Sequence, residues 1–180
     1  MALPCIVFLD IDGVLNAQII GCEGAGVQDD GPRLDAKLVS RFCELVRTTG
    51  CKVVLSSAWR VSAAGRQAVR DALDREGLAE AFIGCTPVAP SDTDHDNPLV
   101  QRAKEIQTWL AREGGAERWC AVDDMDLSRA DANMRKHFVH CDVYEGFQPA
   151  QLKQAMQVLA GTSCGGLEAL QEGDEDDERA

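Results

Sequence analysis

The chain has 180 residues, of which 45% are hydrophobic, and its formal net charge is −12. This length and apolar content predict one folded domain with a full core. The negative charge disfavours tight non-specific binding of DNA or RNA, because neutralisation of phosphates supplies most of that affinity. We expect no membrane span and no signal peptide, because the sequence lacks both a sufficiently long apolar run and a basic segment followed by an apolar stretch.

Eight cysteines are spread along the chain, and no two of them form a Cys-x-x-Cys pair. This pattern disfavours a disulfide framework or a zinc site and favours a reducing compartment, so we expect a cytoplasmic protein. Residues 161–180 hold seven acids and one arginine, and therefore half of the net charge. We predict that residues 1–160 form the domain and that residues 161–180 form an acidic, disordered tail.

The first predicted element is a strand at residues 5–9, an apolar run typical of a strand buried on both faces. Asp10, Asp12 and Gly13 follow it. Positions two apart in an extended chain point to the same side, so both carboxylates can face one pocket at the carboxyl end of the strand. Two like charges held that close repel unless a cation or a proton separates them. The motif therefore predicts a divalent metal, a shared proton or both; the alternative is a solvated acidic turn.

Strand and helix patterns alternate along the rest of the chain. The predicted strands are residues 51–55, 82–83, 119–122 and 137–139, and the predicted helices are residues 34–49, 62–76, 98–113 and 149–159. The connections at residues 13–33 and 84–97 are Gly-rich or polar loops that are too short for an inserted domain. This order predicts a three-layer α/β/α sandwich with a mainly parallel, Rossmann-like sheet and no cap domain.

Polar residues stand at the ends of several predicted strands. Ser56 follows the second strand, and Asp123 and Asp124 come at the end of the fourth. Because the carboxyl ends of parallel strands share one edge of a sheet, we expect these side chains to converge with Asp10 and Asp12.

Four motifs, in the order FLDIDGVLN, VVLSSAWR, RAKEIQTWL and CAVDDMD, resemble those of the haloacid dehalogenase (HAD) superfamily of phosphohydrolases. The amino-acid sequences of these motifs are similar to those in the HAD-like domains of Swiss Army Knife RNA repair proteins, and the resemblance runs from residue 5 to about residue 159. It implies a HAD-like core and a Mg²⁺-dependent phosphatase, a phosphoric monoester hydrolase that acts through an aspartyl phosphate. The acid at position 12 disfavours a dehalogenase within this superfamily.

The resemblance also implies roles for single residues. Asp10 is the expected nucleophile, and Asp12 is the expected general acid and base, whose backbone carbonyl also reaches the metal. Ser56 is expected to donate a hydrogen bond to the transferring phosphoryl group. Asp123 and Asp124 are expected to hold Mg²⁺ together with Asp10 and Asp12.

Basic and aromatic positions complete the predicted site. Arg102 matches the family's positively charged position, and Lys104 is the alternative. Ser57 and Arg60 are predicted substrate contacts, with Arg60 clamping a phosphate or backbone oxygen; the alternative is that Arg60 pairs with a surface acid. We expect Trp59 to fill the core, with stacking on a base as the alternative.

The expected substrate follows from the missing cap. An open site excludes water poorly and relies on the bulk of its substrate, which favours a macromolecular phosphomonoester. The resemblance points to a polynucleotide end, with Arg60 and Arg66 as candidate backbone contacts. A phosphoprotein or nucleotide phosphatase is the alternative enzyme, and a non-catalytic metal-binding docking module is the alternative from another class. A signalling receiver domain is disfavoured, because its phosphoacceptor lies on the third strand. The sequence does not indicate the oligomeric state.

Overall fold

The computed structural model describes residues 5–17, 33–88 and 97–161. These residues form a five-stranded sheet in the order β3-β2-β1-β4-β5, in which every neighbouring pair is parallel. The strands are β1 (Ile6–Leu9), β2 (Lys52–Leu55), β3 (Phe82–Cys85), β4 (Trp119–Asp123) and β5 (Phe138–His140).

Four helices connect or follow the strands, each with a recognisable start. They are α1 (Ala36–Thr49), α2 (Ala63–Arg75), α3 (Pro98–Arg112) and α4 (Pro149–Leu159). The side chains of Asp35, Ser62 and Asn97 accept backbone N–H groups at the first turns of α1, α2 and α3, which satisfies donors that a helix start leaves unpaired. Short 3-10 turns lie between them: η1 (Ala58–Val61), η2 (Ala79–Ala81), η3 (Leu127–Arg129) and η4 (Met134–His137).

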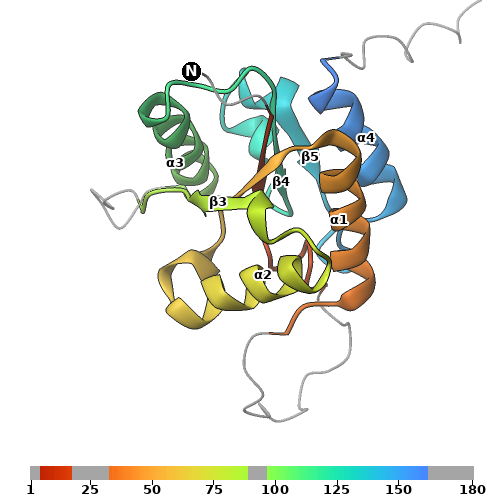
Figure 1. Cartoon of the computed structure of the whole chain (residues 1–180). Coiled ribbons are helices and arrows are strands. Elements are labelled where there is room, and N and C mark those ends of the chain that lie inside the picture. The colour runs from red at the N-terminus through yellow and green to blue at the C-terminus, as the bar shows by residue number, and fades with distance from the viewer. Residues whose placement is uncertain (1–4, 18–32, 89–96, 162–180) are drawn as a thin grey trace, which may run out of the picture.

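The helices cover both faces of the sheet (Figure 1). Side chains alternate along β1, so Val7 and Leu9 join the core formed with α1, α2 and α4, whereas Ile6 and Phe8 join the core formed with α3. Both sets are fully buried, which explains why β1 reads as a continuous apolar run rather than an alternating one. The fold is therefore a three-layer α/β/α sandwich, and none of the described residues forms a cap domain.

The predicted order of strands and helices is confirmed, with small differences at the boundaries. β5 begins at Phe138, because His137 belongs to η4 and its ring stacks on Trp119 with centroids 4.0 Å apart. The 3-10 turns were not predicted. The predicted tail and most of the loop at residues 13–33 lie outside the described residues. No helix in the described parts of the chain is long and apolar enough to cross a membrane.

The topology of the sheet points to a ligand site at the carboxyl ends of β1 and β4. β1 is the central strand, with β2 and β3 on one side and β4 and β5 on the other. The chain therefore runs outward from β1 through β2 to β3 and then returns to place β4 on the other side of β1. Open α/β sheets bind ligands at such a switch point, here between β1 and β4, beyond the carboxyl ends of the strands. Leu9 pairs with Val122 in this ladder, so the residues that follow them lie side by side.

Candidate active site

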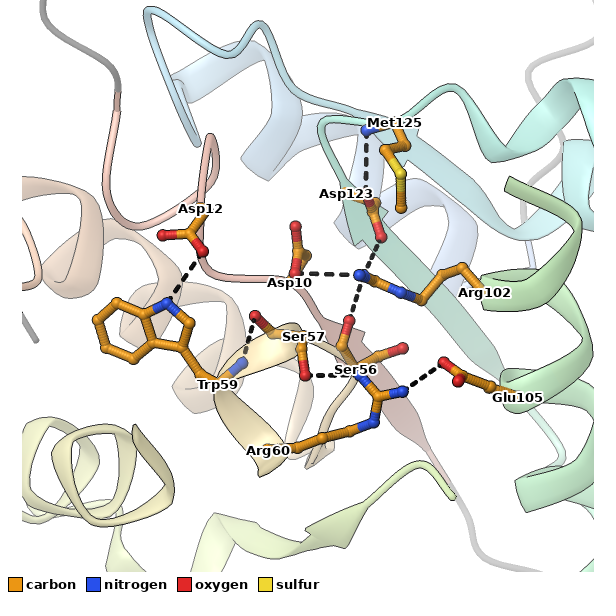
Figure 2. Close-up of polar contacts among 10 residues, drawn as sticks. All are labelled: Asp10, Asp12, Ser56, Ser57, Trp59, Arg60, Arg102, Glu105, Asp123 and Met125. Atoms are coloured by element: carbon orange, nitrogen blue, oxygen red, sulfur yellow. Dashed lines mark hydrogen bonds and ion pairs between the residues drawn. The ribbon is translucent and has the colours of Figure 1, made fainter. Parts of the chain in front are cut away.

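Two buried carboxylates meet at the carboxyl ends of β1 and β4. Asp10 follows β1, is 5% exposed, and donates its backbone N–H to the carbonyl of Val122 at 3.0 Å. Asp123 ends β4 and is 2% exposed. The guanidinium of Arg102, which comes from α3, lies between them, 3.2 Å from Asp10 Oδ1 and 2.6 Å from Asp123 Oδ2 (Figure 2). The same Nη1 also donates to the carbonyl of Ser56. One arginine therefore joins β1, β2 and β4 at this edge.

Asp124 adds a third carboxylate. Asp10, Asp123 and Asp124 each offer an oxygen within 4.8 Å of the others. Gly13 makes this approach possible: it has φ +75°, and a Cβ atom there would lie 2.7 Å from the Cβ, Cγ and Oδ2 atoms of Asp124. The glycine of the first motif is therefore required both by its backbone conformation and by the space that Asp124 occupies.

The electrostatics of this cluster favour a further positive charge. Burial raises the pKa of Asp10, while Arg102 and a hydrogen bond from the Ser57 side chain act to lower it. Burial and the neighbouring Asp10 raise the pKa of Asp123 well above its ordinary value, against the effect of Arg102. Burial acts to lower the pKa of Arg102, but Asp123 and Asp10 together keep it above its ordinary value. Ionisation of all three carboxylates is therefore incompletely compensated by the arginine.

The donor set fits Mg²⁺. When all three carboxylates are ionised, the cluster has three negative charges against the one positive charge of Arg102, which leaves two negative charges for a divalent cation to balance. The three side chains offer only carboxylate oxygens, the hard ligands that Mg²⁺ prefers. Asp10, Asp123 and Asp124 would therefore hold the ion.

The carboxylate of Asp12, which was predicted to converge with the other three, lies apart from this cluster. It is exposed, and its Oδ1 accepts from Asn16 Nδ2 at 3.0 Å while its Oδ2 accepts from Trp59 Nε1 at 2.9 Å. Asp12 and Trp59 are 47 residues apart in sequence and face each other beside Asp10 in Figure 2. Trp59 is only partly buried and packs against the core rather than filling it, and its polar contact with Asp12 was not predicted.

The two serines after β2 take different positions. The Ser57 side chain acts to lower the pKa of Asp10, and its Oγ accepts from the backbone N–H of Trp59 at 3.3 Å. Ser56 continues the ladder by donating its N–H to Leu9, and its buried Oγ has no hydrogen-bond partner among the described residues. Ser57 is therefore the serine whose side chain acts on Asp10, while the predicted hydrogen bond from Ser56 to a transferring phosphoryl group stays a prediction.

Arg60 forms a buried ion pair rather than lining the open edge. Its Nη2 lies 2.7 Å from Glu105 Oε2, and the two side chains are 8% and 2% exposed. Its Nη1 donates to the carbonyl of Ser57 at 2.7 Å. This is the alternative that the sequence analysis left open for Arg60, with a buried acid in place of a surface one. The pair links η1 to α3, the helix that carries Arg102.

The other two predicted basic residues, Lys104 and Arg66, do not contact the carboxylate cluster. Lys104 is exposed on α3, and the structure does not bring it to Asp10 or Asp123, which contact Arg102 instead. Arg66 donates through Nη1 to the carbonyls of Arg60 and Val61. Neither contact of Arg66 reaches the carboxylate cluster.

A parallel sheet with acids after β1 and β4 and an arginine between them defines a HAD-like α/β core. The model of the HAD domain in Swiss Army Knife RNA repair proteins matches residues 6–152, and the chain belongs to this family. A comparison with curated proteins gave no match.

The first prediction concerns the metal. Adding Mg²⁺ should raise the midpoint of thermal unfolding of the wild-type protein, because the ion binds the folded carboxylate cluster. At a hundred times the dissociation constant the gain is about 2.7 kcal/mol, or about 5–10 °C for a domain of this size. Asp124→Asn should lose most of this rise, whereas Asp74→Asn, at an exposed position on α2, should keep it. An equal rise in Asp124→Asn would contradict the proposed ligand set.

Proposed function

We propose that this protein is a Mg²⁺-dependent phosphomonoesterase in which Asp10 is the nucleophile. The observation that carries the proposal is the position of Asp10. Its carboxylate is buried at the carboxyl end of the central strand, paired with Arg102 and grouped with Asp123 and Asp124. Membership of the HAD domain family of RNA repair proteins supports the same class of reaction.

Attack by a carboxylate on a phosphate needs local positive charge. At ~4 Å and an effective dielectric constant of ~20, each pair of unit negative charges costs about 4 kcal/mol. Arg102 supplies one fixed positive charge beside the Asp10 carboxylate, at 3.2 Å. Bound Mg²⁺ would supply the rest by neutralising phosphate oxygens.

The remaining steps need a proton donor and a positioned hydroxyl. Asp10 attacks phosphorus, the P–O bond to the leaving group breaks, and Asp12 gives that oxygen a proton. Asp12 then takes a proton from the water that attacks the phosphorylated Asp10, and the bond between Asp10 and phosphorus breaks. Ser57, whose side chain acts to lower the pKa of Asp10, donates a hydrogen bond to the transferring group, and Ser56 is the alternative donor. The resulting products are an alcohol and inorganic phosphate.

The substrate class we propose is a macromolecular phosphomonoester, first of all a terminal phosphate of a polynucleotide. Two observations support it: the described residues include no cap over the cluster, and the family is named for RNA repair proteins. The contacts of Arg60 and Arg66 are within the protein, so we assign neither to the nucleic-acid backbone. A phosphoprotein or a nucleotide remains the alternative substrate. The intact carboxylate cluster disfavours a non-catalytic docking module.

The test of this proposal is a substrate comparison with Mg²⁺ present. We expect kcat/KM for a 3′- or 5′-phosphorylated oligonucleotide to exceed that for a mononucleotide or sugar phosphate, and Asp10→Asn to lose turnover on all of them while remaining folded. A tenfold preference for the small substrates, about 1.4 kcal/mol of transition-state stabilisation, would contradict the macromolecular substrate. Near wild-type rates in Asp10→Asn would contradict the nucleophile.

The serine assignment gives a matched pair of variants. Ser57→Ala should lower kcat about 10–1000-fold, the range seen when a single donor to a developing negative charge is removed. Ser56→Ala should have a much smaller effect, because in this assignment Ser57 is the donor. Steady-state kinetics on one substrate, with circular dichroism to check folding, measures both. A larger loss in Ser56→Ala would return the role to Ser56.

A further inference from the structure

Asp12 is held by two donors although it is exposed. Its carboxylate accepts one hydrogen bond on each oxygen, from Asn16 Nδ2 at 3.0 Å and from Trp59 Nε1 at 2.9 Å (Figure 2). An exposed aspartate on a turn otherwise samples several side-chain rotamers. Asn16 belongs to the same turn and pairs with Asp12 as an isolated bridge. Trp59 is the partner that comes from another part of the chain.

Trp59 is itself fixed by its surroundings. It lies in η1, its backbone N–H donates to Ser57 Oγ, and its side chain packs partly against the core. The start of α2 approaches it closely: a Cβ atom on Gly65 would lie 2.4 Å from the carbonyl oxygen of Trp59 and 3.0 Å from its Cβ. The backbone of α2 therefore packs directly on the carbonyl oxygen and Cβ of Trp59. This contact constrains the position from which the indole extends to Asp12.

The two donors have a chemical consequence for Asp12. An indole N–H and an amide NH₂ can donate hydrogen bonds but cannot accept them. Trp59 Nε1 and Asn16 Nδ2 therefore cannot take a proton from Asp12, and what they set is the orientation of its carboxyl group. The same N–H groups can donate to the carboxylate after the proton has left, so the side chain keeps its orientation through the transfer.

We propose that Trp59 is a positioning residue that orients the carboxyl group of Asp12 for proton transfer to the leaving oxygen. This role rests on the proposed phosphomonoesterase function. It matters most for a poor leaving group, such as the alkoxide of an aliphatic or ribose hydroxyl, because such an oxygen must be protonated as it departs. A nitrophenolate leaves readily without a proton. The assignment therefore links Trp59 to the hydrolysis of alkyl phosphates.

The kinetic test compares these two leaving groups in Trp59→Phe, which keeps an aromatic ring and removes the N–H. We expect kcat/KM for an alkyl phosphate to fall about tenfold more than kcat/KM for 4-nitrophenyl phosphate, with the loss in kcat rather than KM, because proximity of the acid affects the chemical step. Asp12→Asn should show the same bias more strongly. Adding Trp59→Phe to Asp12→Asn should cause little further loss, since the two residues act as a unit.

A matched control and a readout without turnover complete the test. Trp109→Phe, in the core against Phe8, should leave the ratio of the two kcat/KM values unchanged. The chain has three tryptophans, and the one indole N–H resonance that is missing in Trp59→Phe identifies Trp59 in the NMR spectrum. In Asp12→Ala this resonance should shift more than the other two, because it loses its carboxylate acceptor.

The outcomes separate the two proposals. Wild-type protein that hydrolyses neither these two substrates nor a 3′- or 5′-phosphorylated oligonucleotide would overturn the phosphomonoesterase function, and the positioning role with it. Active wild-type protein with equal losses on both substrates in Trp59→Phe would overturn the positioning role alone. Additive losses in the double variant, or a Trp59 resonance that does not respond to Asp12→Ala, would also overturn it.

Discussion

The repulsion among three carboxylates at the ends of β1 and β4 is the constraint on which the site depends. Asp10 and Asp123 are almost fully buried, where uncompensated charge is expensive. Arg102 lies between them and also binds the carbonyl of Ser56. Arg102 extends to the carboxylates from α3, a helix that packs against the sheet. The charge that Arg102 leaves uncompensated is what makes the cluster a candidate site for a divalent cation.

The position of α3 is supported by a second buried ion pair. Glu105 lies three residues after Arg102 on α3 and binds Arg60 of η1 at 2.7 Å. Arg60 in turn binds the carbonyl of Ser57. Removing one partner of a buried pair leaves an unpaired charge in the interior, which is strongly destabilising. The pair thus connects the turn that carries the two serines and Trp59 with the helix that carries Arg102, and it favours one relative placement of these elements.

Sequence patterns were sufficient for the fold and for the cluster of Asp10, Asp123 and Asp124, but not for the position of the Asp12 carboxylate. Apolar runs and capping residues predict elements close to those observed, and acids at strand ends must converge when the strands are parallel. The directions of the two serine side chains could not be predicted, because they depend on how the chain leaves β2 for η1. The contacts of Trp59 with Asp12 and of Arg60 with Glu105 join residues more than 40 positions apart. No local periodicity encodes such pairs.

Covalent transfer of the phosphoryl group to Asp10 is the central step of the proposed mechanism. Borohydride reduces an acyl phosphate to an alcohol, so it converts a phosphorylated aspartate to homoserine. Protein quenched during turnover, treated with borohydride and mapped by mass spectrometry should carry homoserine at position 10, dependent on both substrate and Mg²⁺. Active protein in which position 10 stays unmodified, or in which the modification lies on another aspartate, would contradict the central claim.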